Sequence, residues 1–402
     1  MKRIFALSCG FYLLIGITSV FMGSLLPELL SHYERGYSDG GTLLFLQFLG
    51  FLAGVIASPI MSTYIGRRSM LLIALCCITA ACLVMGFLPS WMWIILMVLF
   101  VGFGSGIIES SIGAFTIEYA EEGKAVAMAK LDVFFGVGAL LIPAVVSLCI
   151  TLKVWPYTFF TISGITLILV LLWMTMPAAS SSKLHTSDKT DSSSPVTKTR
   201  YTARQVKLLA IFIVFFFVYM GLELGFMNFL PSILIETIHI PKSLASLSVT
   251  FLWIAMVIGR LFVGRVAESV KYLPFLFWST LGSLFFIIAM ALNSSEWATY
   301  LLIFGIGVFM SGLFAIALVY ANSLIPGMTE STTSILIASG GIGGAILQYV
   351  IGWSMTEWPV SYTVWILAGF TVILLVTIGL SHQWNIGNKR VSKQIIQPTN
   401  EM

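Results

Sequence analysis

The stretch SSSKLHTSDKTDSSSPVTKTR at residues 180–200 decides the organisation of this chain, because it is a long polar interruption in an otherwise apolar sequence. Hydrophobic residues make up 58% of the 402 residues, and charged residues make up 9%. A soluble domain carries about 25% charged residues, so a water-soluble globule is excluded. The mean hydropathy of +0.99 indicates a protein that crosses the membrane many times.

Apolar windows predict six membrane spans before this stretch and six after it, each near the ~20 residues that a bilayer requires. The predicted spans are residues 4–26, 42–64, 69–88, 91–117, 130–152, 155–177, 208–235, 243–266, 271–292, 297–321, 333–354 and 360–381. The predicted fold is therefore an all-α membrane protein with 12 transmembrane helices. It divides into an N-terminal six-helix bundle over 1–177, a flexible linker over 178–207 and a C-terminal six-helix bundle with a tail over 208–402.

The distribution of positive charge predicts the orientation. Of the 21 Lys and Arg residues, three lie in the odd-numbered loops, namely Arg35, Lys153 and Lys242. The others lie at the N-terminus, in or beside the even-numbered loops, in the linker and in the C-terminal tail. Positive residues accumulate on the cytoplasmic side of membrane proteins, so both termini and the linker are predicted to be cytoplasmic.

The two halves share glycine and proline positions at a nearly constant offset, and this predicts an internal repeat. An offset of 205 residues relates Gly54 to Gly259, Gly102 to Gly307 and Gly136-Val-Gly138 to Gly341-Ile-Gly343; an offset of 204 relates Leu25-Leu26-Pro27 to Phe229-Leu230-Pro231. Because six spans precede the second copy, both copies enter the membrane in the same direction. The repeat is therefore parallel, with its axis along the membrane normal.

Besides Asp132 at the start of the fifth span, two carboxyl residues lie inside predicted spans, where a charge costs about 2.5–3.5 kcal/mol and usually faces the protein interior or a cavity. Glu109 shares a helical face with the small residues Gly102, Gly106 and Gly113, and Glu223 lies near the centre of its span. A carboxyl in such a site can exchange a proton near neutral pH, so both are candidate proton-coupling residues. The alternative is a structural role, in which each carboxyl pairs with a neighbouring helix.

Further polar and aromatic residues inside the spans are candidates for substrate binding. Amides can donate and accept hydrogen bonds with hydroxyl groups, and an aromatic ring can pack against the apolar face of a sugar. Hydrogen bonding between helices, or ordinary packing for the tryptophan, is the competing interpretation. The candidates are Gln47, Asn228, Trp253 and Gln348.

Charged residues near the cytoplasmic ends of the spans are candidates for gating, since they could clamp carboxylates or helix ends between the two bundles. A solvated loop is the simpler alternative. The gating candidates are Arg67, Arg68, Asp132, Arg260, Arg265 and Glu268.

Several function classes find no support in the residues. There is no phosphate-binding loop, no HExxH motif and no nucleophile elbow, and the five cysteines all lie in apolar runs. No metal site, no enzymatic activity and no cofactor other than a coupling proton is therefore expected. The positive charge is not clustered as nucleic-acid binding requires, and no obligate protein partner is evident.

The chain resembles the major facilitator superfamily along its length, and within it the fucose–galactose–glucose proton symporter branch. The motifs that carry this resemblance are GSLLPELL (23–30), FLQFLGFLAGV (45–55), GFGSGIIESSIGAF (102–115), KLDVFFGVGALLIP (130–143), YMGLELGFMNFLPSIL (219–234), SVTFLWIAMVIGR (248–260) and ASGGIGGAILQYVIGWS (338–354). The resemblance implies a bacterial plasma-membrane protein that works by alternating access. It also implies proton-coupled hexose uptake, with Glu109 as the essential membrane carboxylate.

Two motifs depart from the pattern of the family. The loop motif G-x-x-x-D-R-x-G-R-[KR] survives after the second span only as Gly66-Arg67-Arg68, with Thr63 at its acidic position. The fucose symporters carry an acidic residue in the first span where this chain has Gly23. Coupling would therefore depend on Glu109 and Glu223.

The function predicted from the sequence is proton-coupled uptake of a neutral hexose. The alternative is a proton-driven exporter of drugs or other small solutes, because such exporters also combine buried carboxylates with aromatic and Met-rich walls. The 18 Met and 30 Phe residues are compatible with that alternative. A receptor that senses its substrate without transporting it is a third possibility, which the absence of any signalling domain disfavours.

Overall fold

The computed structural model describes residues 2–119, 124–175, 201–325 and 329–396, and within these ranges the chain is helical with no β-strand. The N-terminal half contains α1 (Lys2–Tyr33), α2 (Tyr37–Gly86), α3 (Trp91–Tyr119), α4 (Lys124–Thr151) and α5 (Tyr157–Met174). The C-terminal half contains α7 (Ala203–Ile238), α8 (Lys242–Val270), α9 (Tyr272–Leu292), α10 (Glu296–Met310), α11 (Leu313–Leu324), α12 (Thr329–Glu357) and α13 (Ser361–Ile396).

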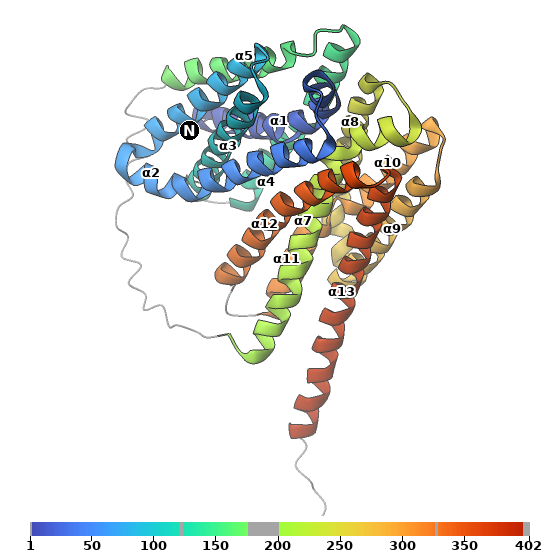
Figure 1. The fold of residues 1–402 in the computed structure, drawn as a ribbon. Coiled ribbons are helices and arrows are strands. Elements are labelled where there is room, and N and C mark those ends of the chain that lie inside the picture. Colours follow the sequence, from blue (N-terminus) through green and yellow to red (C-terminus); the bar gives the residue numbers. More distant parts are fainter. Residues whose placement is uncertain (1, 120–123, 176–200, 326–328, 397–402) are drawn as a thin grey trace, which may run out of the picture.

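The number of membrane crossings follows from the long helix α2. Within the described residues, 11 helical stretches are long and apolar enough to cross a membrane, and α2 is one of them with 50 residues. At 1.5 Å per residue it would extend for about 75 Å, more than twice the ~30 Å hydrocarbon core. The backbone leaves the helical region at Gly66 (φ 76°, ψ 149°), and α2 doubles back there (Figure 1). Counting α2 twice gives the predicted twelve crossings.

The observed helices are mostly longer than the predicted spans. The helix α8 ends at Val270 rather than at residue 266, so Arg265 and Glu268 lie in a helix and not in a loop. The helix α13 continues to Ile396, well into the predicted tail. Residues 178–200 of the predicted linker lie outside the described residues, and α7 already begins at Ala203. An apolar window detects only the part of a helix that lies in the membrane, and a helix can extend beyond it.

The predicted repeat is visible in the contacts between helices. A Cβ atom added at Gly54 of α2 would overlap the carbonyl oxygen of Phe103 in α3, and one added at Gly259 of α8 would lie 3.1 Å from the carbonyl oxygen of Val308 in α10. Phe103 and Val308 are themselves 205 residues apart, so both the glycine and its neighbour are repeated. Two further contacts repeat in the same way: Gly102 with Gln47 and Gly307 with Leu252; Gly138 with Leu13 and Gly343 with Phe217.

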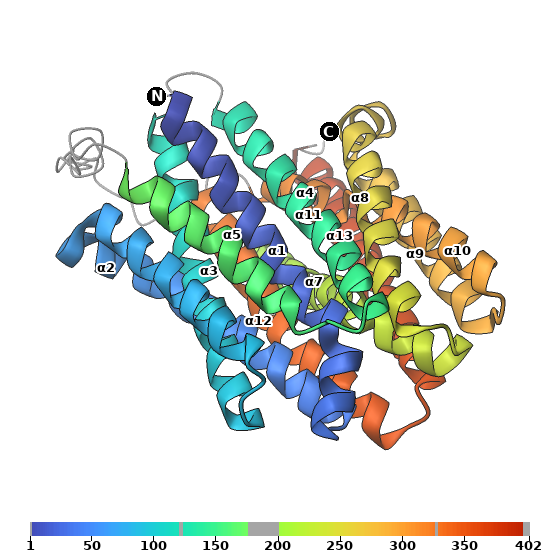
Figure 2. The same ribbon diagram turned by 90° about the horizontal axis from the view of Figure 1, so that it is seen from above.

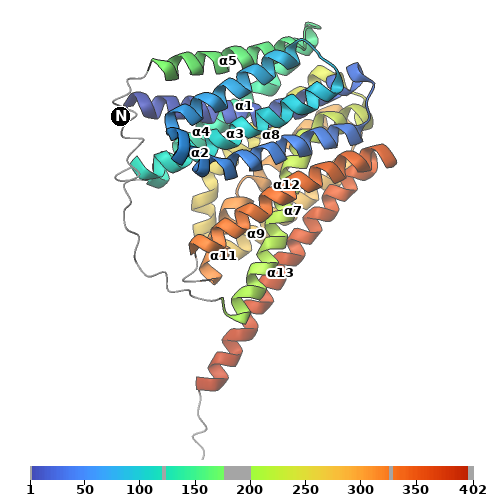
Figure 3. The same ribbon diagram turned by 60° about the vertical axis from the view of Figure 1, so that its left-hand side comes forward.

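The two halves meet mainly through the helix pairs α1 with α7, α2 with α12 and α4 with α8. Figure 2 shows α4 lying beside α8. We call the face that contains the turns at residues 34–36, 239–241 and 358–360 the distal face, and the opposite face, where Gly66 lies, the proximal face. In Figures 1 and 3 the two halves run together near the distal face and diverge toward the proximal face, where the N-terminus lies.

Polar contacts between the halves gather at the distal face. Tyr37 donates a hydrogen bond from its hydroxyl to Oε1 of Glu236 at 2.6 Å. The backbone N–H of Ser38 donates to Oγ1 of Thr356 at 2.8 Å. The ammonium of Lys242 lies 3.3 Å from a carboxylate oxygen of Glu28. The distal face is therefore closed in this conformation.

Candidate functional site

Three residues of the C-terminal half form a charged and aromatic cluster. On α8, Trp253 and Arg260 are seven residues apart and so lie on one helical face. The guanidinium carbon of Arg260 lies 5.6 Å from the centre of the Trp253 ring. Its Nη2 atom lies 3.9 Å from Oε1 of Glu223 on α7. The Glu223 side chain is 15% exposed and the Arg260 side chain is 41% exposed. The Glu223 carboxylate is therefore mostly covered, whereas part of the Arg260 side chain is uncovered.

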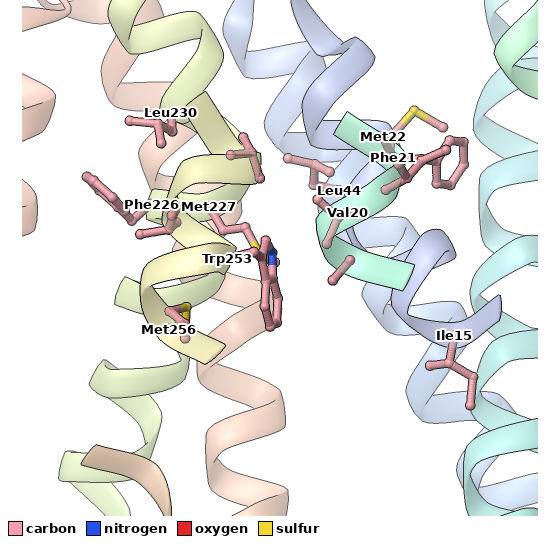
Figure 4. Packing of buried hydrophobic residues seen from close by; sticks show 14 of the residues in the cluster. Ile15, Val20, Phe21, Met22, Leu44, Phe226, Met227, Leu230, Trp253 and Met256 are labelled. Atoms are coloured by element: carbon pink, nitrogen blue, oxygen red, sulfur yellow. The ribbon is translucent and has the colours of Figure 1, made fainter. Parts of the chain in front are cut away.

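This face of α8 points toward the N-terminal half. The rings of Trp253 and Phe135, which is on α4, are 5.8 Å apart in an edge-to-face arrangement. One turn further along, a Cβ atom added at Gly136 would lie 3.4 Å from a methyl group of Val257. Figure 4 shows Trp253 projecting from α8 toward the helices of the N-terminal half. The cluster therefore lies at the interface across which the halves would move.

Two predicted amides bond to each other beside this cluster. The side-chain N–H of Asn228 on α7 donates to Oε1 of Gln348 on α12 at 2.7 Å. Gln348 donates in turn to the carbonyl oxygen of Gly344 at 2.8 Å. Both amides are almost fully buried. The pair supports the helix-to-helix interpretation, although it does not use the full hydrogen-bonding capacity of either amide.

Asn228 also explains the glycine at position 23. A Cβ atom added at Gly23 of α1 would lie 2.5 Å from the Cα of Asn228 and 2.8 Å from its Cβ. The amide thus occupies the space into which a side chain at position 23 would project. The departure from the symporter pattern at Gly23 is therefore a packing requirement of this chain.

The predicted residue Gln47 lies on α2, in the N-terminal half. Its side-chain N–H donates to the carbonyl oxygen of Thr18 on α1 at 2.7 Å. This hydrogen bond fixes the amide between two helices and leaves its oxygen for another partner.

Three of the predicted residues carry a buried polar atom that has no hydrogen-bond partner among the residues that the structure describes. These atoms are Oε1 of Gln47, Oδ1 of Asn228 and Nε1 of Trp253. A buried polar atom without a partner costs about 1–3 kcal/mol, and most such atoms in native proteins have a partner. Two acceptors and one donor, contributed by both halves, therefore have unused hydrogen-bonding capacity in this conformation.

Glu109 is half-buried on α3. A Cβ atom at Gly106 would overlap the carbonyl oxygen of Phe51 on α2, and one at Gly113 would lie 3.2 Å from the hydroxyl of Tyr12 on α1. The glycine face of α3 therefore lies against α2 and α1, as the sequence predicts. Glu109 lies on this face between the two contacts.

The predicted gating residues fall in different places. Near the α2 turn, the Arg67 guanidinium lies over the ring of Phe115 at 5.9 Å, and Arg68 donates to the carbonyl oxygen of Met174 at 3.3 Å. These contacts join helices of the N-terminal half to each other. Arg265 and Glu268 are exposed on α8. Asp132 lies on α4, and its side chain is outside the described residues. Arg260 lies in the cluster with Glu223 rather than at a loop.

The sequence did not predict the contacts at the distal face. Tyr37 and Glu236 are 199 residues apart, and Glu28 and Lys242 are 214 apart. Neither pair forms a motif, and a local pattern cannot predict which loops meet. A pocket of about 430 Å³ also lies at this face, lined by residues such as Glu236, Asn293 and Ser361. Its lining does not include Gln47, Asn228 or Trp253. The described residues contain no group of three or more His, Cys, Asp or Glu side chains that could hold a metal ion.

Comparison with known families accounts for this architecture. The Major Facilitator Superfamily model matches residues 7–232 and 208–387, which together span most of the chain. The chain belongs to the major facilitator superfamily. The predicted membership and the predicted twelve-helix fold are both confirmed, and the chain is a multi-pass membrane protein.

Relatives within the superfamily cover almost the whole chain. The glucose/mannose transporter GlcP of Bacillus subtilis (strain 168) is 30% identical over 375 residues, which is 92% of this chain and 92% of that protein. Bypass of stop codon protein 6 of Saccharomyces cerevisiae is 23% identical, over 85% of this chain and 74% of that protein. An inward open conformation of the xylose transporter XylE from E. coli superposes with a TM-score of 0.74 at 12% identity, over 95% of each chain. That likeness concerns the fold alone.

Proposed function

We propose that this protein takes up a neutral hexose together with a proton. The observation that carries the proposal is the set of three buried, unpartnered polar atoms on Gln47, Asn228 and Trp253, contributed by both halves of the molecule. Sugar hydroxyls can both donate and accept hydrogen bonds, so one hexose could satisfy all three atoms. The similarity to a glucose/mannose transporter of B. subtilis supports the same substrate class.

Glu109 is the proposed proton carrier. It lies on α3 in the N-terminal half, whereas the other membrane carboxylate, Glu223, faces the guanidinium of Arg260. Glu223 already forms an ion pair with Arg260, and this makes it the weaker candidate for releasing and rebinding a proton in each cycle. Glu223 then acts as an acceptor in the substrate site.

The proposed orientation places the proximal face in the cytoplasm. The support is the distribution of Lys and Arg, because Arg35, Lys153 and Lys242 alone lie in the odd-numbered loops. With that orientation, the closed distal face is extracellular and the conformation described above is open to the cytoplasm. Uptake would proceed by closing the proximal face and separating the contacts at the distal face.

The decisive experiment uses protein reconstituted in liposomes that contain a pH-sensitive dye. Glucose, mannose, galactose and fucose are added outside in turn. We expect at least one sugar to acidify the lumen, because sugar and proton enter together. Alkalinisation on addition of a cationic dye, with no response to any sugar, would instead support the exporter alternative.

The variant Glu109→Gln tests the coupling. It should abolish accumulation of sugar against a gradient but keep the exchange of labelled sugar with a preloaded lumen, since exchange needs no net proton movement. Glu296→Gln, an exposed carboxylate in the first turn of α10, is the matched control and should behave as the unmodified protein. Loss of both accumulation and exchange in Glu109→Gln would contradict a role limited to carrying the proton.

A further inference from the structure

Arg260 lies inside the membrane helix α8. Its guanidinium contacts Glu223 and the Trp253 ring. Arg260 lies 18 residues from Lys242 at the distal end of α8, which is about 27 Å along the helix axis. It therefore lies in the part of the molecule where the halves diverge. Its side chain is 41% exposed, on the helical face that carries Trp253 and points toward α4.

The geometry of its ion pair leaves room for a ligand. The distance of 3.9 Å between Arg260 Nη2 and Glu223 Oε1 is too long for a hydrogen bond, which requires about 2.7–3.2 Å. In the part of the chain that the structure describes, Arg260 makes this ion pair and the contact with Trp253 but no direct hydrogen bond. A guanidinium carries five N–H donors in a planar fork. Most of that donor capacity is therefore unused, and 41% of the side chain is exposed.

We infer that Arg260 and Glu223 bind neighbouring hydroxyls of the transported sugar as a pair. A guanidinium N–H would donate to a hydroxyl oxygen, and that hydroxyl or its neighbour would donate to the Glu223 carboxylate. Both hydrogen bonds involve an ionised group and are stronger than neutral ones. The inference rests on the proposed function, because it names residues that form hydrogen bonds with the hydroxyl groups of the same substrate.

The charge balance of the cluster favours a neutral solute. One guanidinium beside one carboxylate has no net charge, and pairing is the usual way in which charges are tolerated in a membrane segment. An anionic substrate would be attracted by Arg260 but repelled by Glu223 beside it. A polyol with adjacent hydroxyls satisfies both groups at once.

Trp253 has a second role in this inference. The Arg260 guanidinium lies over its ring, so this aromatic face holds the arginine through a cation–π contact. The indole N–H, which has no partner among the described residues, remains available as a further donor. The ring therefore orients Arg260 rather than packing against the sugar with that face.

The test compares the binding affinities of deoxy sugars to find which hydroxyl group each residue contacts. Purified protein in detergent binds radiolabelled glucose, and unlabelled glucose and its 1-, 2-, 3-, 4- and 6-deoxy analogues compete for the site. Loss of a hydroxyl that contacts a charged group should weaken binding roughly 10- to 100-fold. In Arg260→Met, the analogue that lacks the hydroxyl bound by Arg260 should bind as well as glucose does, because the lost partner no longer matters. The other analogues should keep their deficits.

Two further variants and a control complete the design. Arg260→Lys should recover part of the discrimination at the same hydroxyl, and Glu223→Gln should reduce discrimination at that hydroxyl or its neighbour. Lys271→Met, at an exposed position at the end of α8, should leave the whole pattern unchanged. If Arg260→Met does not fold, Arg260→Lys and Glu223→Gln provide the same comparison.

The outcomes separate this inference from the proposed function. If unmodified protein binds none of glucose, mannose, galactose and fucose, the proposed function is wrong. If it binds sugar but Arg260→Met, Arg260→Lys and Glu223→Gln weaken all analogues by one common factor, the two residues only support the structure and the inference is wrong. A preserved wild-type pattern in these variants, or complete loss of binding in all three with normal folding, contradicts the inference as well.

Discussion

The indole nitrogen of Trp253 illustrates how a residue can serve binding at the expense of stability. It is a buried donor without a partner among the described residues, and such a donor destabilises the folded state by about 1–3 kcal/mol. Trp253→Phe removes the donor but keeps an aromatic ring. We expect sugar binding to weaken roughly 5- to 10-fold while the melting temperature does not fall, because the loss of ring area is offset by the removal of the unpaired donor.

Trp173 is the matched control for this substitution. It is also buried, but its indole N–H donates to the carbonyl oxygen of Arg68 at 3.1 Å. Trp173→Phe should therefore lower the melting temperature and leave sugar affinity unchanged. Both quantities are read from one purified sample by thermal unfolding and radioligand binding. Equal loss of stability in the two variants would show that the Trp253 nitrogen has a partner.

Much of the candidate site was predictable at the residue scale because polar residues are rare in apolar spans. Gln47, Asn228 and Trp253 stand out in the sequence for this reason, and each carries a buried polar atom without a partner among the described residues. The position of Arg260 was not predictable in the same way. Periodicity shows which helical face a residue occupies, but the helix that lies opposite that face is a property of the tertiary structure.

At the scale of single elements, close packing of α2 against α3 depends on glycine. A Cβ atom at Gly102 would overlap the carbonyl oxygen of Gln47, and at Gly307 it would lie 2.7 Å from the Cβ of Ala255, whereas at Gly164 of α5 nothing lies within 4 Å. We expect Gly102→Ala to destabilise most and Gly307→Ala less. Gly164→Ala should stabilise by up to about 1 kcal/mol, since alanine is the better helix former.

Thermal unfolding of the three variants in detergent checks this order. Gly164→Ala is the control for the effect of adding a methyl group to a helix without a steric contact. A Gly102→Ala variant as stable as the Gly164→Ala variant would show that α2 and α3 are not packed as closely as described. The close contact also fixes Gln47 beside α3, so sugar affinity should fall together with stability in Gly102→Ala.

The boundaries of elements were the least predictable part of the fold. The turn at Gly66 was predicted as a short loop, because the Gly-Arg-Arg sequence there is polar. In the structure a single residue with a positive φ separates two nearly continuous helices. A glycine adopts this conformation without the strain that a side chain would introduce, so the loop predicted between residues 64 and 69 is reduced to one residue.

At the scale of the whole molecule, the repeat preserves packing but not polarity. Contacts between glycines and carbonyl groups recur at an offset of 204 or 205 residues, whereas the candidate functional residues do not. The position equivalent to Glu109 is Phe314, and the position equivalent to Arg260 is Val55. Symmetric packing gives two similar halves. The polar residues are not symmetric: the proposed proton carrier Glu109 lies in the N-terminal half, and the proposed sugar ligands Arg260 and Glu223 lie in the C-terminal half. The glycine pattern made the repeat predictable from the sequence. The contacts between the halves at the distal face were not predictable, because they depend on the conformation of the protein.

The closed distal face yields a prediction about the transport cycle. Ser38→Cys with Thr356→Cys places two thiols where the backbone N–H of Ser38 now bonds Thr356. Oxidation with copper phenanthroline should stop sugar transport, and a reductant should restore it, because outward opening requires these residues to separate. Each single variant and the unmodified protein, which contains five cysteines, are the controls. Undiminished transport in fully cross-linked protein would contradict alternating access through this face.

The crossing of α1 over α7 at Gly23 has a mechanical consequence. With the Asn228 backbone against it, α1 has about 15 Å of helix on the distal side, to Tyr33, and about 32 Å on the proximal side, to Lys2. A rotation about this crossing moves the proximal end roughly twice as far as the distal end. If the halves rotate about this crossing, opening at the proximal face is therefore about twice as large as the accompanying movement at the distal face.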